Sequence, residues 1–114
     1  MLAKTLVAAS TRPMVLAILR SGENYGYKII QCVKKISGGC LDWSEPMLYP
    51  LLKRMEREGL VKSRWKLLDN KKPRKYYQLT EKGFKQQVLE QDQWFQISSI
   101  FRKLLDTELL METQ

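Results

Sequence analysis

The chain contains no histidine and only two cysteines, Cys32 and Cys40, among its 114 residues. Histidine is the side chain most often used as a general base, a metal ligand and a proton switch near neutral pH. The two cysteines form no Cys-x-x-Cys pair, and two thiols without histidine supply too few ligands for a structural zinc site. We therefore expect no metal centre and no cofactor, and we interpret Cys32 as a small buried side chain.

Residue combinations typical of enzymes are also missing. The sequence has no glycine-rich phosphate loop, no nucleophile that a histidine base would activate and no cluster of metal ligands. Its carboxylates are scattered among basic neighbours, which is typical of surface charge. We predict that the protein is not an enzyme.

Long apolar runs are absent as well. None approaches the ~20 residues that a helix needs to span a bilayer, and the short run at residues 6–9 is too brief for the core of a signal peptide. The sequence therefore predicts a cytoplasmic protein that does not enter a membrane.

Positive charge, by contrast, is abundant. The chain has 20 lysines and arginines against 12 acids, a net charge of +8. Ten of these cations fall within a short stretch that holds only Glu56, Glu58 and Asp69 as acids: Lys53, Arg54, Arg57, Lys62, Arg64, Lys66, Lys71, Lys72, Arg74 and Lys75. Such clustering favours an acidic partner, with nucleic acid the first candidate and an anionic membrane surface the second.

Two helices are predicted before this basic stretch. The first contains Val15, Leu16, Ile18 and Leu19 and ends at a serine–glycine pair. Its start is ambiguous: Thr11 and Pro13 suit a cap and first turn, yet Leu2, Leu6, Val7 and Ala8 allow one longer helix bent at Pro13. The second opens at Asn24 as N-cap and runs to Ser37, with one apolar face formed by Tyr25, Ile29, Val33 and Ile36.

A third helix is predicted from Ser44, a good N-cap, to Gly59, which ends it. Its buried stripe is Leu48, Leu51, Leu52 and Met55, and its opposite face carries Pro46, Tyr49, Pro50, Lys53 and Arg57. Local rules predict a bend at Pro50, which lacks a backbone donor.

A basic hairpin follows this helix. Residues 60–67 and 74–79 alternate as two strands around a turn at residues 69–73. Lys62, Arg64 and Lys66 share one strand face. A hairpin of only two strands is marginal alone, so we expect it to pack on the helices.

The last predicted helix begins at Thr80, its cap, and extends to about Met111. It would be about 45 Å long, whereas the preceding globule is roughly 25 Å across. Its overhanging part would expose an apolar stripe, so we expect a second copy of the chain to cover it. The stripe consists of Trp94, Ile97, Phe101, Leu104 and Leu105.

These elements together predict a mainly α fold: a winged helix-turn-helix with a two-stranded wing and a long C-terminal dimerisation helix. We expect residues 1–80 to form the DNA-binding domain and residues 81–114 the dimerisation helix. The third helix would lie in the major groove and the basic wing against the backbone or the minor groove. The candidate DNA-binding residues are Lys28, Lys34, Ser44, Met47, Tyr49, Lys53, Arg57, Lys62, Arg64, Lys71, Lys72 and Arg74.

Three alternatives stay open. The basic surface could serve solubility alone, or dock an acidic protein, or bind DNA without sequence preference. Likewise, the aromatic residues of the last helix are either plain packing or the lining of a small-molecule pocket.

The segments NYGYKI, LYPLLKRMEREGLVKSRW and RKYYQLTEKG resemble the PadR family of bacterial transcriptional regulators, in kind and in order over residues 14–84. The short chain resembles the small members with a single C-terminal helix. This resemblance implies a homodimeric winged-helix repressor, one long first helix that takes part in the dimer, and a proline tolerated inside the recognition helix at Pro50. It also implies a pocket for a small aromatic effector at Trp94.

Two positions depart from the family pattern. Pro46 and Met47 stand where the family usually has a small residue and a threonine, so a hydroxyl that could hold phosphate is replaced by a thioether. The wing turn has Lys71, Lys72 and Pro73 in place of a glycine, which predicts a stiffer tip.

Overall fold

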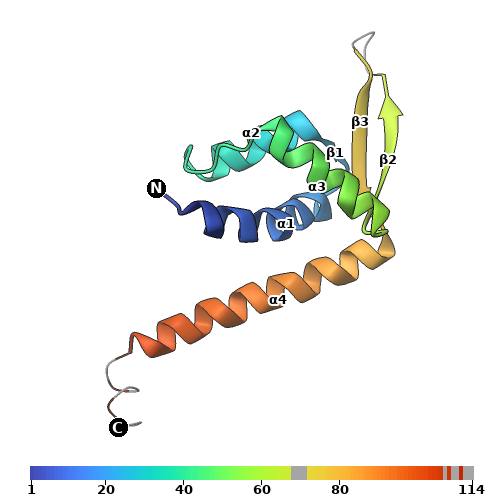
Figure 1. The fold of residues 1–114 in the computed structure, drawn as a ribbon. Coiled ribbons are helices and arrows are strands. Elements are labelled where there is room, and N and C mark those ends of the chain that lie inside the picture. The colour runs from blue at the N-terminus through green and yellow to red at the C-terminus, as the bar shows by residue number, and fades with distance from the viewer. Residues whose placement is uncertain (68–71, 107, 109–110, 112–114) are drawn as a thin grey trace.

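The computed structural model describes residues 1–67, 72–106, 108 and 111, so the predicted site residue Lys71 and the centre of the wing turn lie outside the described part. The fold is mainly helical with a small antiparallel sheet, as the sequence predicted (Figure 1). The elements follow in the order α1 (Lys4–Arg20), β1 (Asn24–Tyr25), α2 (Gly26–Ile36), α3 (Glu45–Arg57), β2 (Val61–Lys66), β3 (Arg74–Leu79) and α4 (Glu81–Leu104).

Helix α1 is one long helix that continues through Pro13, so the longer of the two alternatives for the first helix is correct. Upstream of the proline, the hydroxyl of Thr11 donates a hydrogen bond of 2.7 Å to the carbonyl of Val7. The C-terminal half of α1 contributes Val15, Leu16 and Leu19 to the core, and each of these side chains is almost inaccessible to solvent.

The prediction that Asn24 caps the second helix is wrong. Asn24 and Tyr25 form a short strand that pairs with Tyr77 and Tyr76 of β3, and α2 begins only at Gly26. Asparagine often caps helices, but here its backbone pairs with the edge strand of the hairpin instead. This pairing supplies hydrogen-bond partners for backbone groups of β3 that would otherwise be unpaired. The sheet therefore has the order β1-β3-β2, one strand more than predicted.

The expected apolar face of α2 is only partly buried. Ile29 and Val33 are buried, whereas Ile36 is 80% exposed, contrary to the prediction. Ile36 is the last residue of α2, where it lines a shallow apolar hollow with Met14 and Ile18 of α1 and is left without a third layer to cover it.

Helix α3 begins as predicted. The hydroxyl of Ser44 accepts a hydrogen bond of 3.3 Å from the backbone N–H of Met47, and Gly59, with φ of 77°, ends the helix. The helix is continuous past Pro50, which lies on its exposed face. Proline has no N–H, and on this face water can donate a hydrogen bond to the carbonyl of the preceding turn that is left without a backbone donor.

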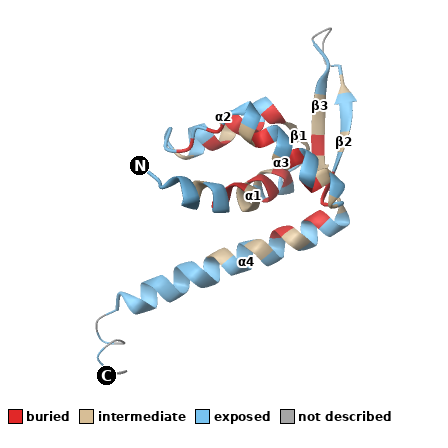
Figure 2. Ribbon diagram, viewed as in Figure 1, coloured by how far each residue is buried: buried red, intermediate tan, exposed pale blue. Residues whose placement is uncertain are grey.

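The core lies where α1, α2 and α3 meet, and Figure 2 shows buried residues on the inward sides of all three helices. Leu48, Leu52 and Met55 of α3 are fully buried against Leu16 and Ile29 of α1 and α2 within this cluster. Burying each such side chain contributes roughly 1.5–3 kcal/mol.

The hairpin has the predicted strands, in a register that runs from Val61 opposite Leu79 to Lys66 opposite Arg74. Its lower end is buried and its upper end stands clear of the helices (Figure 1). Trp65 is consequently 68% exposed although it shares a strand face with the buried Val61. A hydrogen bond of 2.5 Å from Ser63 to Glu56 ties the wing to α3.

Helix α4 begins at the predicted cap, since the hydroxyl of Thr80 accepts a hydrogen bond of 3.0 Å from the N–H of Gly83. It ends at Leu104, however, not near Met111 as predicted. Just beyond, the carboxylate of Asp106 accepts a hydrogen bond from the N–H of Glu108, a local turn that competes with continued helix.

The first half of α4 packs along α1, and the second half leaves the body of the molecule (Figure 1). Arg12 of α1 donates hydrogen bonds to Glu58 at the end of α3 (2.8 Å) and to Glu90 of α4 (3.1 Å). Burial opposes the charge of Arg12, but the two carboxylates outweigh it and raise its pKa above the ordinary value. One guanidinium thus joins three helices.

We predict that Gly83→Ala destabilises the fold. A Cβ atom at this position would lie 2.0 Å from the carbonyl oxygen of Leu60, a backbone atom that cannot move aside without disturbing β2. The expected loss is about 1–3 kcal/mol in the free energy of unfolding, measured by chemical denaturation.

Gly26→Ala is the matched control for this helical glycine. Its Cβ would meet only the end of the Tyr49 ring, which is partly exposed and can rotate away. Equal losses for the two variants would contradict the assigned backbone contact.

Candidate nucleic-acid interface

The outward face of α3 presents a continuous polar surface. Tyr49, Lys53 and Arg57 are exposed and follow one another at every fourth position, so the structure brings these three predicted residues together on one side, with the exposed Ser44 at the N-terminal end of the helix. Unpaired backbone N–H groups at the start of a helix favour an anion, and the first turns can reach base edges in a major groove.

Tyr49 is held in place by a close approach of α2. A Cβ on Gly26 would lie 2.7 Å from the ring end and the hydroxyl oxygen of Tyr49, so the ring keeps its present orientation only beside a glycine. Burial raises the pKa of Tyr49, the nearby Glu45 raises it further, and Arg74 opposes both. The phenol therefore remains a protonated hydrogen-bond donor at neutral pH.

A hollow of about 390 Å³ separates α3 from the wing. Aromatic rings and cations alternate on its walls: Lys75 lies 5.8 Å from the ring centre of Tyr77, and the guanidinium of Arg74 lies 4.6 Å from that of Tyr25. Stacking on a ring restrains the direction of each cation without neutralising it. The lining residues are Tyr25, Tyr49, Trp65, Lys72, Pro73, Arg74, Lys75 and Tyr77.

The cations predicted for the wing that the structure describes have exposed side chains. Lys62, Lys72 and Arg74 are exposed, and Arg64, with 62% of its side chain exposed, is paired with Glu23. Lys72 and Arg74 line the same hollow as Tyr49, so this part of the wing and the outward face of α3 form one basic surface. Lys62 and Arg64 lie on the opposite face of β2 from Ser63, which bonds to α3.

Three further predicted residues lie outside the outward face of α3 and the wing. Lys28 and Lys34 are exposed on α2, and Lys34 lies 3.9 Å from Asp42 in an ion pair. Met47 is half-buried, packs against the core and lines an apolar hollow beside α1 with Leu51, away from the basic surface.

Sequence reasoning missed part of this surface. Tyr25 was assigned to the buried face of a helix, and the pairing that places it in β1 connects residues far apart in the chain. Trp65, Lys66 and Lys75 lay within the predicted strands, where the alternation of the hairpin could have placed each on a face. The closeness of Trp65 and Lys75 to α3 needed the three-dimensional packing.

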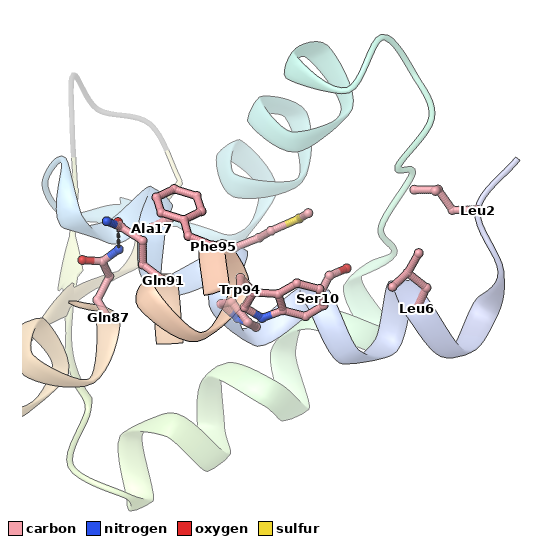
Figure 3. A pocket seen from close by; sticks show the side chains of 10 residues that line it. Leu2, Leu6, Ser10, Ala17, Gln87, Gln91, Trp94 and Phe95 are labelled. Atoms are coloured by element: carbon pink, nitrogen blue, oxygen red, sulfur yellow. Dashed lines mark hydrogen bonds between the residues drawn. The ribbon is translucent and has the colours of Figure 1, made fainter. Parts of the chain in front are cut away.

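A second hollow of about 390 Å³ lies between α1 and α4 (Figure 3). Its walls are almost wholly apolar and it opens to solvent; a buried Gln87 at one end accepts a hydrogen bond from Arg20 (2.7 Å) and donates one to Gln91 (2.9 Å). The lining residues are Leu2, Leu6, Ser10, Pro13, Met14, Ala17, Gln87, Gln91, Trp94 and Phe95.

Of the five residues predicted as an aromatic and apolar stripe, only Trp94 lines this hollow. Ile97, Phe101, Leu104 and Leu105 lie further along α4 with between 51% and 80% of their surface exposed. The stripe is thus present, but in a single chain nothing among the described residues covers it (Figure 2).

Other kinds of site find no support in the described ranges. They contain no group of three or more histidine, cysteine or acidic residues placed to hold a metal ion. Nor do they contain a helix that is long and apolar enough to cross a membrane.

A three-helix core, a recognition-type helix with a basic outer face and an adjoining basic hairpin define a winged-helix protein. The family model described as the transcriptional regulator PadR-like family matches residues 15–90. The chain therefore belongs to the PadR-like family of transcriptional regulators, and its place among regulators agrees with the prediction that it is not an enzyme.

Relatives agree with this assignment. The negative transcriptional regulator PadR of Bacillus subtilis is 34% identical over 69 residues, which cover 60% of this chain and 38% of that regulator. A solved PadR-like regulator from Bacillus cereus is 29% identical, with 90% of this chain and 98% of that chain covered and a TM-score of 0.79. A PadR family regulator from Eggerthella lenta is 31% identical, with 90% and 84% covered and a TM-score of 0.72.

Proposed function

We propose that the protein is a sequence-specific, homodimeric DNA-binding repressor that acts in the cytoplasm. The observation that carries the proposal is the single basic surface formed by the outward face of α3 and the wing. Tyr49, Lys53 and Arg57 are exposed on a face that contributes nothing to the core, so they are free to meet a ligand. Repression is the activity named for the Bacillus subtilis relative.

In this proposal the two parts of the surface have different tasks. The first turns of α3 enter the major groove, where side chains can distinguish base edges. The wing cations Lys62, Lys72 and Arg74, with Lys28 and Lys34 of α2, contact phosphates and add affinity that does not depend on sequence, and Arg64 can join them once it leaves Glu23. The hollow between α3 and the wing accommodates the sugar–phosphate backbone, with the phenol of Tyr49 as a donor.

Dimerisation is supported by the apolar surface of α4. Only Gly83 and Gln87 of this helix are buried, and the exposed side chains include Phe95, Ile97 and Phe101. Monomeric soluble proteins rarely leave so much contiguous apolar surface in water. We therefore assign residues 81–114 to the dimer interface, with residues 1–80 as the DNA-binding domain, and expect a two-fold axis that matches an inverted repeat.

The measurement that tests the proposal is a pull-down of sheared host DNA with the purified protein at about 0.15 M salt, where non-specific contacts weaken. Enrichment of one or a few promoter fragments that share an inverted repeat would support it. Such a fragment should bind about 1000-fold more tightly than a random duplex. Uniform recovery of all fragments would indicate an architectural DNA binder, and no recovery a protein-docking module.

For the wing, we predict that Lys72→Ala weakens binding to every duplex by a similar factor. Loss of one phosphate contact should flatten the dependence of log affinity on log salt by about 0.9. Lys85→Ala on α4 removes the same charge from a side chain that is 79% exposed and distant from the wing, and should leave this slope unchanged. A loss confined to the best operator would contradict the wing assignment.

For the interface, we predict that Phe101→Asp converts the protein to monomers, because two carboxylates would be buried opposite each other at the two-fold axis. Light scattering after gel filtration measures the mass. Ile36→Asp, which alters an apolar residue on α2 that is more exposed than Phe101, should remain dimeric. If both variants kept the mass of the wild type, α4 would not be the interface.

We further propose that a flat aromatic effector binds the hollow at Trp94 and releases the operator. The apolar walls and the amides of Gln87 and Gln91 suit a ligand of this kind. Adding planar aromatic compounds should quench tryptophan fluorescence, and Trp94→Ala should abolish that change while leaving the signal of Trp43 and Trp65. Equal quenching in wild type and variant would place the binding elsewhere.

A further inference from the structure

Glu23 reaches across the sheet to two cations of the wing. It lies just before β1 at one edge, whereas Arg64 and Lys66 belong to β2 at the other edge, with β3 between them. The two carboxylate oxygens accept hydrogen bonds from Nε of Arg64 at 3.2 Å and from its terminal nitrogen at 3.0 Å. The ammonium of Lys66 pairs with the same carboxylate.

An aromatic pair lies on the same face beside this contact. Arg64 stands opposite Tyr76 in the register of the sheet, and Tyr76 stands opposite Tyr25, so the three side chains share one face. The two rings are 5.2 Å apart at 61°, and the ammonium of Lys66 lies 4.6 Å from the ring centre of Tyr76. The geometry around Glu23 is therefore built by side chains from all three strands.

The exposure of the three charged side chains is unequal. Glu23 is 22% exposed and Lys66 is 26% exposed, whereas Arg64 is 62% exposed. A shielded carboxylate is screened less by salt than an open one. Arg64 in contrast can still swing toward solvent, so its guanidinium is within reach of a competing anion.

We propose that Glu23 limits the sequence-independent DNA affinity of the wing by holding Arg64 and Lys66 away from phosphate. The inference rests on the proposed DNA-binding function. Each cation that neutralises a phosphate releases counterions and strengthens binding to any duplex. A cation that is already paired with a carboxylate releases fewer counterions from the DNA, because the phosphate must first displace Glu23.

The consequence concerns the charge that the wing offers to DNA. Binding to random DNA competes with binding to an operator, since a genome offers a vast excess of random sites. Of the three cations on this face of β2, Lys62 alone makes no ion pair within the described residues. Glu23 thus leaves the wing basic while reducing the charge that any phosphate backbone can use.

The test is Glu23→Gln, assayed by fluorescence anisotropy with a random-sequence duplex between 50 and 200 mM salt. The amide keeps an oxygen that accepts a hydrogen bond from Arg64, so the fold should persist, which a thermal melt checks. One additional phosphate contact steepens the salt slope by about 0.9, which is about a 3.5-fold greater loss of affinity over this range. We expect that change, with tighter binding at 50 mM.

Glu81→Gln is the matched control. It removes the same charge from a side chain that is 89% exposed on the first turn of α4 and pairs only with Lys85 within the described residues. Its salt slope should equal that of the wild type. If the salt slope steepened equally in both variants, the effect would come from net charge alone and the proposal would be overturned. An unchanged slope or weaker binding in Glu23→Gln would overturn it as well.

A double-mutant comparison isolates the pair. Arg64→Gln should weaken random-duplex binding by a larger factor when introduced into Glu23→Gln than into the wild type, because only there is Arg64 free. Equal factors would overturn the proposal. Failure of the wild type itself to bind any duplex at 50 mM salt would instead refute the DNA-binding function on which the inference rests.

Discussion

The burial of one stripe of α3 determines how the rest of the molecule is arranged. Leu48, Leu52 and Met55 are fully buried among side chains of α1 and α2, and a helix that commits one face to a core must turn the other outward. The hairpin then leaves α3 at Gly59 and folds back beside it, which brings the wing next to the free face. The α3 part of the basic surface is therefore a result of packing the core, since its cations have no other face of this helix to occupy.

Much of this arrangement could be predicted from periodicity and capping. The stripe of α3, its Ser44 cap and the alternation of the hairpin are local signals, and the folded chain has the helix start, the buried face and the strands that they predict. Local signals failed where a distant partner decided the conformation. Asn24 has a side chain suited to a helix cap, but it pairs with the edge of β3 and is part of a strand. Ile36 fits an apolar face whose last turn has no neighbour.

The candidate site was predictable to a similar degree. The exposed cations of α3 and the wing followed from charge and pattern, because such residues remain at the surface whatever the packing. The contacts that organise them did not, since Gly26 lies beneath Tyr49 only in the folded chain and Glu23 reaches Arg64 only across an intervening strand. Chain separation hides both pairs, and neither belongs to a periodic pattern.

Because the outward face of α3 is absent from the core, most of its residues can be exchanged without a thermodynamic penalty. Lys53 and Arg57 are exposed and are not members of the core cluster, so new operator preferences could arise there by single substitutions at little cost in stability. Tyr49 is the exception, since its ring rests on Gly26 in another helix. The fold thus leaves most of its recognition surface free to diverge, and ties the orientation of one side chain on it to the residue at a second site.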